Sequence, residues 1–237
     1  MRVVLVIACL LSLSHSAIAG EVFWRFPNKI SPAERYLFYV HGKIVETEGV
    51  SPISPRFGHY QFHRIVTRLA KGKANVIARV RHGKTDPNAE AFRLTNEMRY
   101  MLKNGVPADH ISVAGFSKGG YITLLTANRL QSSDIRYIVM AGCTNAIVDG
   151  SDKIADGLQG TIMSMNDATD DLGFSCRPLF ERSPQLAASM DVTFETGKGH
   201  GLFYRPDPIW IEPLLQWVEM EKQTDVESAA SDSAARG

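Results

Sequence analysis

A serine set between two glycines is the residue of this chain best placed to do covalent chemistry. Ser117 lies in the segment GFSKG, residues 115–119, which has the G-x-S-x-G spacing of a nucleophile elbow. The two glycines allow a turn that is too tight for neighbouring Cβ atoms. A hydroxyl at the tip of such a turn is placed to attack a carbonyl carbon. The same residues also fit a Gly-rich turn whose serine only caps the next helix.

The segments on either side of Ser117 favour the catalytic interpretation. Residues 111–114, ISVA, form a short apolar run that is typical of a buried strand, and an apolar helical pattern begins at Tyr121. A strand, a sharp turn and a helix are the context that a nucleophile elbow requires.

A serine hydroxyl is a poor nucleophile until a base removes its proton, so the elbow needs a histidine. Of the seven histidines in the chain, His200 follows the last predicted strand, in the segment GKGHG. Its flanking glycines would let the loop carry the ring back over the sheet edge; a flexible loop with an incidental histidine is the alternative. A carboxylate that orients the imidazole is expected in the acidic segment 166–171, NDATDD, at the end of the preceding strand.

Strands and helices alternate along the rest of the chain. Apolar and β-branched runs predict strands, and residues 51–57, with two prolines, predict a loop. Alternation of this kind indicates one α/β domain with a parallel sheet covered by helices on both faces. The predicted strands are 35–40, 75–80, 111–114, 135–141, 161–165 and 191–195, and the predicted helices are 58–72, 87–105, 121–130 and 208–221.

The two ends of the chain do not fit this domain. Residues 1–19 combine Arg2, an apolar run and the A-x-A sequence at 17–19, which together predict a cleaved secretory signal. The apolar run is too short for a membrane span. Residues 222–237 are rich in Ser, Ala and acidic side chains and predict a disordered tail. We therefore expect a single domain over residues 20–221, in an exported protein that is periplasmic or secreted.

Charge and cysteine content narrow the choice of partners and compartment. The chain has 26 Lys and Arg against 25 Asp and Glu, a balance that favours neither nucleic acid nor an anionic membrane as partner. Cys9 falls in the predicted signal, which leaves Cys143 and Cys176. In an oxidising compartment such a pair predicts a disulfide, with two buried free thiols as the alternative.

Two further groups of side chains carry less specific signals. His59 and His63 are four residues apart, as two metal ligands on one helix would be, but they have no intervening Glu and no clear third ligand. No metal is therefore predicted. Arg79, Arg81 and His82 end a predicted strand, where they would either contact an acidic substrate or pair with nearby carboxylates.

The chain resembles the α/β-hydrolase superfamily over about residues 36–218. The resemblance rests on the elbow, on the chain order Ser, Asp, His, and on the pair His41-Gly42 after an early strand. The resemblance implies a doubly wound, mostly parallel sheet with helices on both faces. It also implies a small member, because residues 143–160 are too few for the large helical cap that many relatives carry.

The resemblance implies a choice among the acidic residues. In the superfamily, the acid commonly stands three residues beyond a small turn residue that ends the strand. Aligning Asp167 with that turn position, where the family usually has Gly, puts Asp170 in the place of the acid. Asp167 and Asp171 remain alternatives.

His41-Gly42 is similar to the oxyanion-loop signature of the superfamily. The resemblance implies that the backbone N–H of Lys43 and that of Lys118, which follows the nucleophile, bind the developing negative charge. The ammonium groups of the two lysines have no part in this, and the side chain of His41 is expected to be structural.

The implied activity is the hydrolysis of carboxylic esters, with a small-molecule acyl compound as substrate and no metal or organic cofactor. Ser117 would form an acyl-enzyme, His200 would move the proton and Asp170 would orient His200. A non-catalytic binding protein of the same fold is one alternative. An acyltransferase that uses the same triad with another acceptor is the second.

Overall fold

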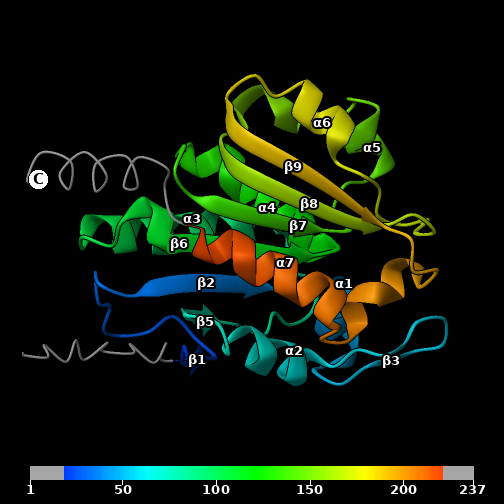
Figure 1. Ribbon diagram of the computed structural model, residues 1–237, viewed down its shortest axis with the longest axis horizontal. Helices are drawn as coiled ribbons and strands as arrows, with labels where there is room; N and C mark the ends of the chain where they lie inside the picture. Colours follow the sequence, from blue (N-terminus) through cyan, green and yellow to red (C-terminus); the bar gives the residue numbers. More distant parts are fainter. Residues whose placement is uncertain (1–18, 221–237) are drawn as a thin grey trace, which may run out of the picture.

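A seven-stranded sheet organises the protein, of which the computed structural model describes residues 19–220 (Figure 1). The predicted signal, apart from Ala19, and the predicted tail lie outside these residues. The strand order is β1-β5-β2-β6-β7-β8-β9, and every neighbouring pair is parallel. The strands are β1 (Val22–Phe23), β2 (Arg35–Val40), β5 (Ala74–Ile77), β6 (Ile111–Phe116), β7 (Arg136–Met140), β8 (Gly160–Asp167) and β9 (Leu186–Phe194).

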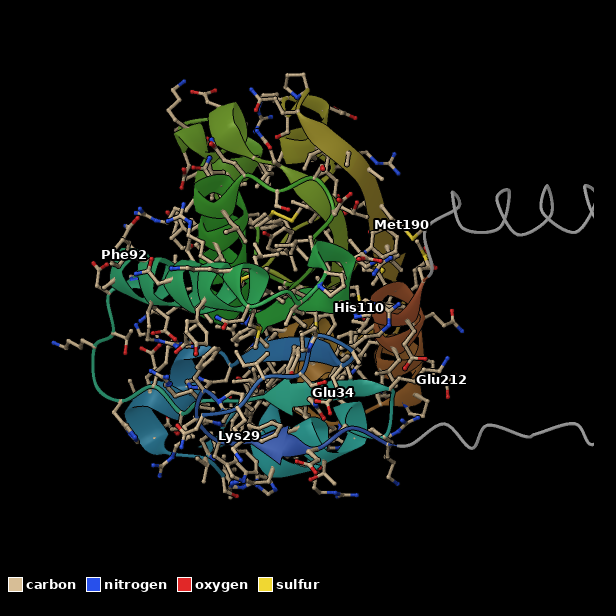
Figure 2. The ribbon with its side chains drawn as sticks, turned by 90° about the vertical axis from the view of Figure 1, so that its left-hand side faces the viewer. Lys29, Glu34, Phe92, His110, Met190 and Glu212 are labelled. Atoms are coloured by element: carbon tan, nitrogen blue, oxygen red, sulfur yellow. A yellow bond between two sulfur atoms is a disulfide. The ribbon has the colours of Figure 1, made fainter. Side chains whose placement is uncertain are left out.

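Helices cover both faces of the sheet, as predicted. On one face, α2 (Phe62–Leu69) and α7 (Pro208–Glu219) bury apolar side chains against the strands, and on the other face α3 (Pro87–Lys103) and α4 (Lys118–Leu130) do the same. Figure 2 shows Phe92 of α3 and Glu212 of α7 on opposite sides of the sheet. The two apolar cores remove the faces of the sheet from water, which is the main stabilising contribution in such a layered fold.

The region between β2 and α2 differs most from the expectation. Residues 43–48 form a helix, α1 (Lys43–Glu48), which was not predicted. Residues 51–57 are not all loop, because β3 (Ile53–Ser54) pairs antiparallel with β4 (Gly58–His59). Because the hairpin includes residues 58 and 59, α2 begins at Phe62 rather than near residue 58.

The remaining helices are short. They are α5 (Asn145–Val148), α6 (Arg177–Glu181) and the 3-10 helices η1 (Ala108–His110), η2 (Lys153–Gly157) and η3 (Gly199–Tyr204). Only α5 and η2 lie between residues 143 and 160, so this region carries no large cap. No helix between residues 19 and 220 has the length and apolar character needed to cross a bilayer.

The winding of the sheet reverses beside β2, because β5 is added on one side of this strand and β6 on the other. In open parallel sheets, ligands bind at the carboxyl edge next to such a reversal. The register of β2 and β6 ends with Val40 opposite Gly115. His41 and Ser117, which follow these two strands, therefore emerge at the same edge, beside the point of reversal.

Candidate active site

Ser117 occupies a strained turn between β6 and α4. Its φ of 56° and ψ of −120° lie outside the regions that side-chain-bearing residues normally adopt. Its N–H donates to the carbonyl oxygen of Met140, 2.8 Å away, which fixes the turn to β7. The flanking glycines are required, because a Cβ on Gly119 would lie 1.9 Å from the carbonyl oxygen of Val40, and one on Gly115 would lie 2.1 Å from that of Gly119.

His200 lies on η3, the element that follows β9, and is 5% exposed. Its ring packs against Phe116, with centroids 4.8 Å apart, and against Phe57 of the β3–β4 hairpin, at 5.8 Å. Because Phe116 immediately precedes Ser117, the imidazole lies against the end of the strand that carries the serine. The ring Nδ1 is 2.8 Å from Oδ2 of Asp170. In the neutral ring this contact puts the proton on Nδ1 and leaves Nε2 as an acceptor.

The carboxylate bonded to His200 belongs to Asp170, whose side chain is fully buried. Its other oxygen, Oδ1, accepts the backbone N–H groups of Leu172 and Gly173, at 2.9 and 3.2 Å. These bonds hold the carboxylate in one orientation, so that Oδ2 remains directed at the imidazole. The contact between Asp170 and His200 therefore joins the loop after β8 to the loop after β9 at the carboxyl edge of the sheet.

The two alternative acids bond elsewhere. Asp167 accepts hydrogen bonds from the backbone and hydroxyl groups of Thr169 and Thr196, and a further one from the N–H of Gly199. Burial opposes its ionisation, but the bonds from the two threonines outweigh that effect and lower its pKa well below the usual range. Asp171 is exposed and pairs with Arg56 at 2.9 Å.

Two helix N-termini lie beside Ser117. Lys43 is the first residue of α1 and Lys118 the first of α4, and Ser117 itself precedes α4. A Cβ on Gly42 would lie 3.5 Å from the Cβ of Ser117, so the backbone before Lys43 passes directly over the serine. The first N–H groups of a helix have no acceptor within the helix and carry partial positive charge. This arrangement is suited to binding an anion.

Both ring nitrogens of His41 are hydrogen-bonded to the backbone. Its Nδ1 donates to the carbonyl oxygen of Gly42 at 2.8 Å, and its Nε2 accepts the backbone N–H of Arg81 at 2.9 Å. Burial, followed by the positive charge of Arg81, lowers the pKa of His41 to about 3. His41 is therefore a neutral side chain that joins β2 to the segment after β5.

The arginines at the exit of β5 pair with carboxylates. Arg79 meets Glu97 at 2.8 Å and Arg81 meets Glu46 at 2.8 Å. Of the two uses that the sequence allowed for these arginines, the structure therefore favours pairing over a free position for an acidic substrate. Glu46 was missed because α1, which carries it, was not predicted.

His59 and His63, whose spacing alone would have allowed a shared helix face, do not lie on one helix. His59 lies on β4 and its Nε2 is 2.6 Å from Oγ of Ser51, whereas His63 lies on α2 with its ring edge-on to Trp24. Across the part of the chain that is described, no three His, Cys, Asp or Glu side chains are grouped as metal ligands.

The predicted disulfide between Cys143 and Cys176 is present, with Cα atoms 5.5 Å apart. Cys143 follows the end of β7, and Cys176 precedes α6, six residues after Asp170. The N–H of Phe174 also donates to the carbonyl oxygen of Cys143 at 2.8 Å. The segment that continues from Asp170 is therefore anchored to the residues just after β7 by a disulfide and a hydrogen bond, both at Cys143.

Comparisons with known proteins identify the fold. No protein-family model and no curated protein matches the sequence. Among solved structures, a truncated carbohydrate esterase from gut microbiota is similar over 81% of this chain and 87% of its own, with a TM-score of 0.53 and 12% identity. A gene product of Listeria innocua is similar over 80% and 96%, with a TM-score of 0.51 and 10% identity.

A third similar structure is a bifunctional GH43-CE protein of Bacteroides eggerthii, with a TM-score of 0.51 and 11% identity. The match covers 81% of this chain but only 35% of that protein. These similarities extend over most of the described residues and agree with the parallel sheet and its two helical layers. The protein has the α/β-hydrolase fold.

Proposed function

We propose that the protein is an exported serine hydrolase that cleaves carboxylic esters through an acyl-enzyme. The observation that carries the proposal is the buried pair of His200 and Asp170, 2.8 Å apart, packed against Phe116 beside the strained Ser117. A histidine whose Nδ1 is held by a carboxylate, next to a serine on an elbow, is the arrangement that activates a hydroxyl.

In this mechanism Ser117 Oγ attacks the acyl carbonyl while Nε2 of His200 takes its proton. Asp170 keeps the ring in the required tautomer and stabilises the imidazolium that forms. The N–H groups of Lys43 and Lys118 bind the oxyanion. His200 then protonates the leaving alcohol, and water, activated by the same ring, releases the acid and regenerates the serine.

Esters are the substrates that we propose, with carbohydrate esters among them, because one of the similar structures is described as a carbohydrate esterase. The predicted export is supported by the disulfide, since disulfides persist mainly in oxidising compartments.

A fluorophosphonate probe tests the proposal on the protein recovered from the periplasm or the medium. We expect the probe to label the wild type and the Ser189→Ala control, whose serine is exposed on β9, but not Ser117→Ala. Hydrolysis of short acyl esters should fall by a factor on the order of 10⁴ to 10⁶ in Ser117→Ala and in His200→Ala.

The other outcomes identify the alternatives. A wild type that is neither labelled nor active on esters would be a non-catalytic binding protein. Labelling with transfer of the acyl group to an added alcohol, faster than to water, would indicate an acyltransferase. Recovery of the protein only from the cytosol would contradict export.

A further inference from the structure

A buried carboxylate joins the segments around the elbow. Glu46, on α1, places Oε1 2.8 Å from Nε of Arg81 and Oε2 2.6 Å from Nζ of Lys118. The side chains of Glu46 and Arg81 are 1% and 3% exposed, and that of Lys118 is 18% exposed. One carboxylate thus holds two cations from two other parts of the chain.

The first cation belongs to the residue after the proposed nucleophile. Besides Glu46, Nζ of Lys118 contacts the carbonyl oxygen of Thr85 at 2.5 Å. The side chain of Lys118 is therefore fixed at its far end by two acceptors, from α1 and from the loop before α3. Because Lys118 is the first residue of α4, this restraint acts on the peptide whose N–H is the proposed oxyanion donor.

The second cation, Arg81, is connected by hydrogen bonds to the peptide of the other proposed oxyanion donor, Lys43. The guanidinium of Arg81 donates to the carbonyl oxygen of His41, and the backbone N–H of Arg81 donates to the ring of His41. His41 in turn donates to the carbonyl oxygen of Gly42, the residue directly before Lys43. A continuous set of hydrogen bonds therefore runs from Glu46 to the peptide that leads into α1.

Stability alone is a weak explanation for this cluster. Burying an ion pair costs about as much in lost hydration as the attraction returns, so apolar residues of similar size would often serve as well. What the cluster specifically does is connect α1 to α4, the two helices whose first N–H groups flank Ser117. Donors that are fixed before the reaction stabilise an oxyanion far better than donors that must reorganise.

We propose that Glu46 is a positioning residue, which fixes the oxyanion donors of Lys43 and Lys118 relative to each other by bonding Lys118 directly and His41-Gly42 through Arg81. The proposal rests on the proposed serine hydrolase activity. The charge of the cluster supports it as well, because one carboxylate faces two cations and leaves excess positive charge beside a site where negative charge develops.

Glu46→Gln tests the proposal, because it keeps the size of the side chain but loses the charge and one acceptor. We expect kcat to fall by about 10- to 100-fold with little change in KM, since the loss is confined to the transition state. Affinity for a boronic acid should fall in parallel, because its serine adduct carries a negative charge where the oxyanion forms. Lys118→Met should behave in the same way, and the double variant should be no worse than either single variant.

Glu97→Gln is the matched control. Glu97, on α3, also bridges two cations, Arg79 at 2.8 Å and Arg93 at 2.5 Å, with its side chain 14% exposed. Neither partner contacts the elbow or the His41-Gly42 segment in any hydrogen bond or ion pair of the described residues. We expect Glu97→Gln to lower the melting temperature while kcat and boronic acid affinity stay at wild-type values.

Three outcomes would overturn the proposal. In the first, Glu46→Gln loses only stability, as Glu97→Gln does, and keeps wild-type affinity for the boronic acid. In the second, Glu46→Gln does not fold and Lys118→Met, which retains the pair of Glu46 and Arg81, shows full kcat. In the third, the wild type itself neither reacts with the fluorophosphonate nor hydrolyses esters, and this result alone also removes the proposed function.

Discussion

At the scale of single residues, the loop after β8 separates three neighbouring carboxylates by what each one bonds. Asp170 meets His200, Asp171 meets an exposed arginine, and Asp167 ties the end of β8 to the loop after β9. The hydroxyl groups of Thr169 and Thr196 occupy the two carboxylate oxygens of Asp167. We infer that the three residues have different roles, catalytic, peripheral and structural.

Single Asp→Asn variants should separate these roles. Asp170→Asn should lower kcat by a factor on the order of 10⁴, because an amide no longer holds the required tautomer of His200. Asp171→Asn should stay close to wild type, since an exposed ion pair contributes about 0–1 kcal/mol. Asp167→Asn should lower the melting temperature clearly, with only a small loss of kcat.

The measurements are kcat on a short acyl ester and thermal unfolding of each variant. Near-wild-type kcat in Asp170→Asn would remove this residue from the triad. A large loss of kcat in Asp167→Asn, without loss of stability, would move the catalytic role to Asp167.

At the scale of elements, the loop after β8, which carries Asp170, is held at both ends. The bonds of Asp167 anchor its start, and the disulfide between Cys143 and Cys176 anchors the segment that follows it. The disulfide closes a segment with a sequence separation of 33 residues. On the chain-entropy model, such a crosslink stabilises the fold by about 3–4 kcal/mol through restriction of the unfolded chain.

Replacing both cysteines by serine should therefore lower the free energy of unfolding by about 3–4 kcal/mol. We also expect a several-fold lower kcat at temperatures where the variant remains folded, because the loop that carries Asp170 is less restrained. Denaturant unfolding and ester kinetics measure the two effects. A reductant should lower the stability and the kcat of the wild type in the same way and should change neither quantity in the variant. If kcat is unchanged in the reduced wild type and in the variant, the disulfide has only a stabilising role.

The helix α1 shows how an element can depend on its surroundings. It has six residues, far fewer than an isolated helix needs to be stable in water, and it is followed by Gly49, whose φ is 85°. Val45 is buried in the core and Glu46 is held by its ion pairs. Tertiary contacts therefore account for this helix, which explains why no local pattern predicted it.

At the scale of the whole molecule, two buried groups make folding depend on pH. His41 has a pKa of about 3 in the folded protein against 6.5 ordinarily, so below pH 6.5 the unfolded chain binds a proton that the folded protein refuses. The stability that comes from neutral His41 is thus lost as the pH falls from about 6.5 towards 3. Asp167, whose pKa is also lowered, adds to the loss below about pH 4.

We expect the free energy of unfolding to decrease with falling pH between about 6 and 4, with a slope from His41 of up to about 1.4 kcal/mol per pH unit. His41→Gln removes the titrating ring, so the variant should be less stable at pH 7 but show a shallower slope in this range. Urea unfolding at a series of pH values measures both. Equal slopes in the two proteins would show that His41 does not titrate as its burial implies.

Local sequence patterns predicted the parts of the protein that depend on neighbouring residues. The elbow was recognisable because the steric demands of the turn fall on glycines within two residues of Ser117, and strands and helices were recognisable by their apolar periodicity. Their alternation was sufficient to predict a parallel sheet with helices on both faces, which the structure confirms.

The tertiary structure decided which distant polar side chains meet at the sheet edge. The family resemblance favoured Asp170 as the acid but left Asp167 and Asp171 open, because the partner of His200 depends on how the ends of β8 and β9 face each other. The pairing of Glu46 with Lys118 joins residues 72 positions apart, through a helix that forms only in its folded surroundings. Spacing along the chain therefore determined the candidate nucleophile, Ser117, and the strand before it. The side chains that surround Ser117 were determined by the packing of loops at the sheet edge, because the register of whole strands sets which loops meet there.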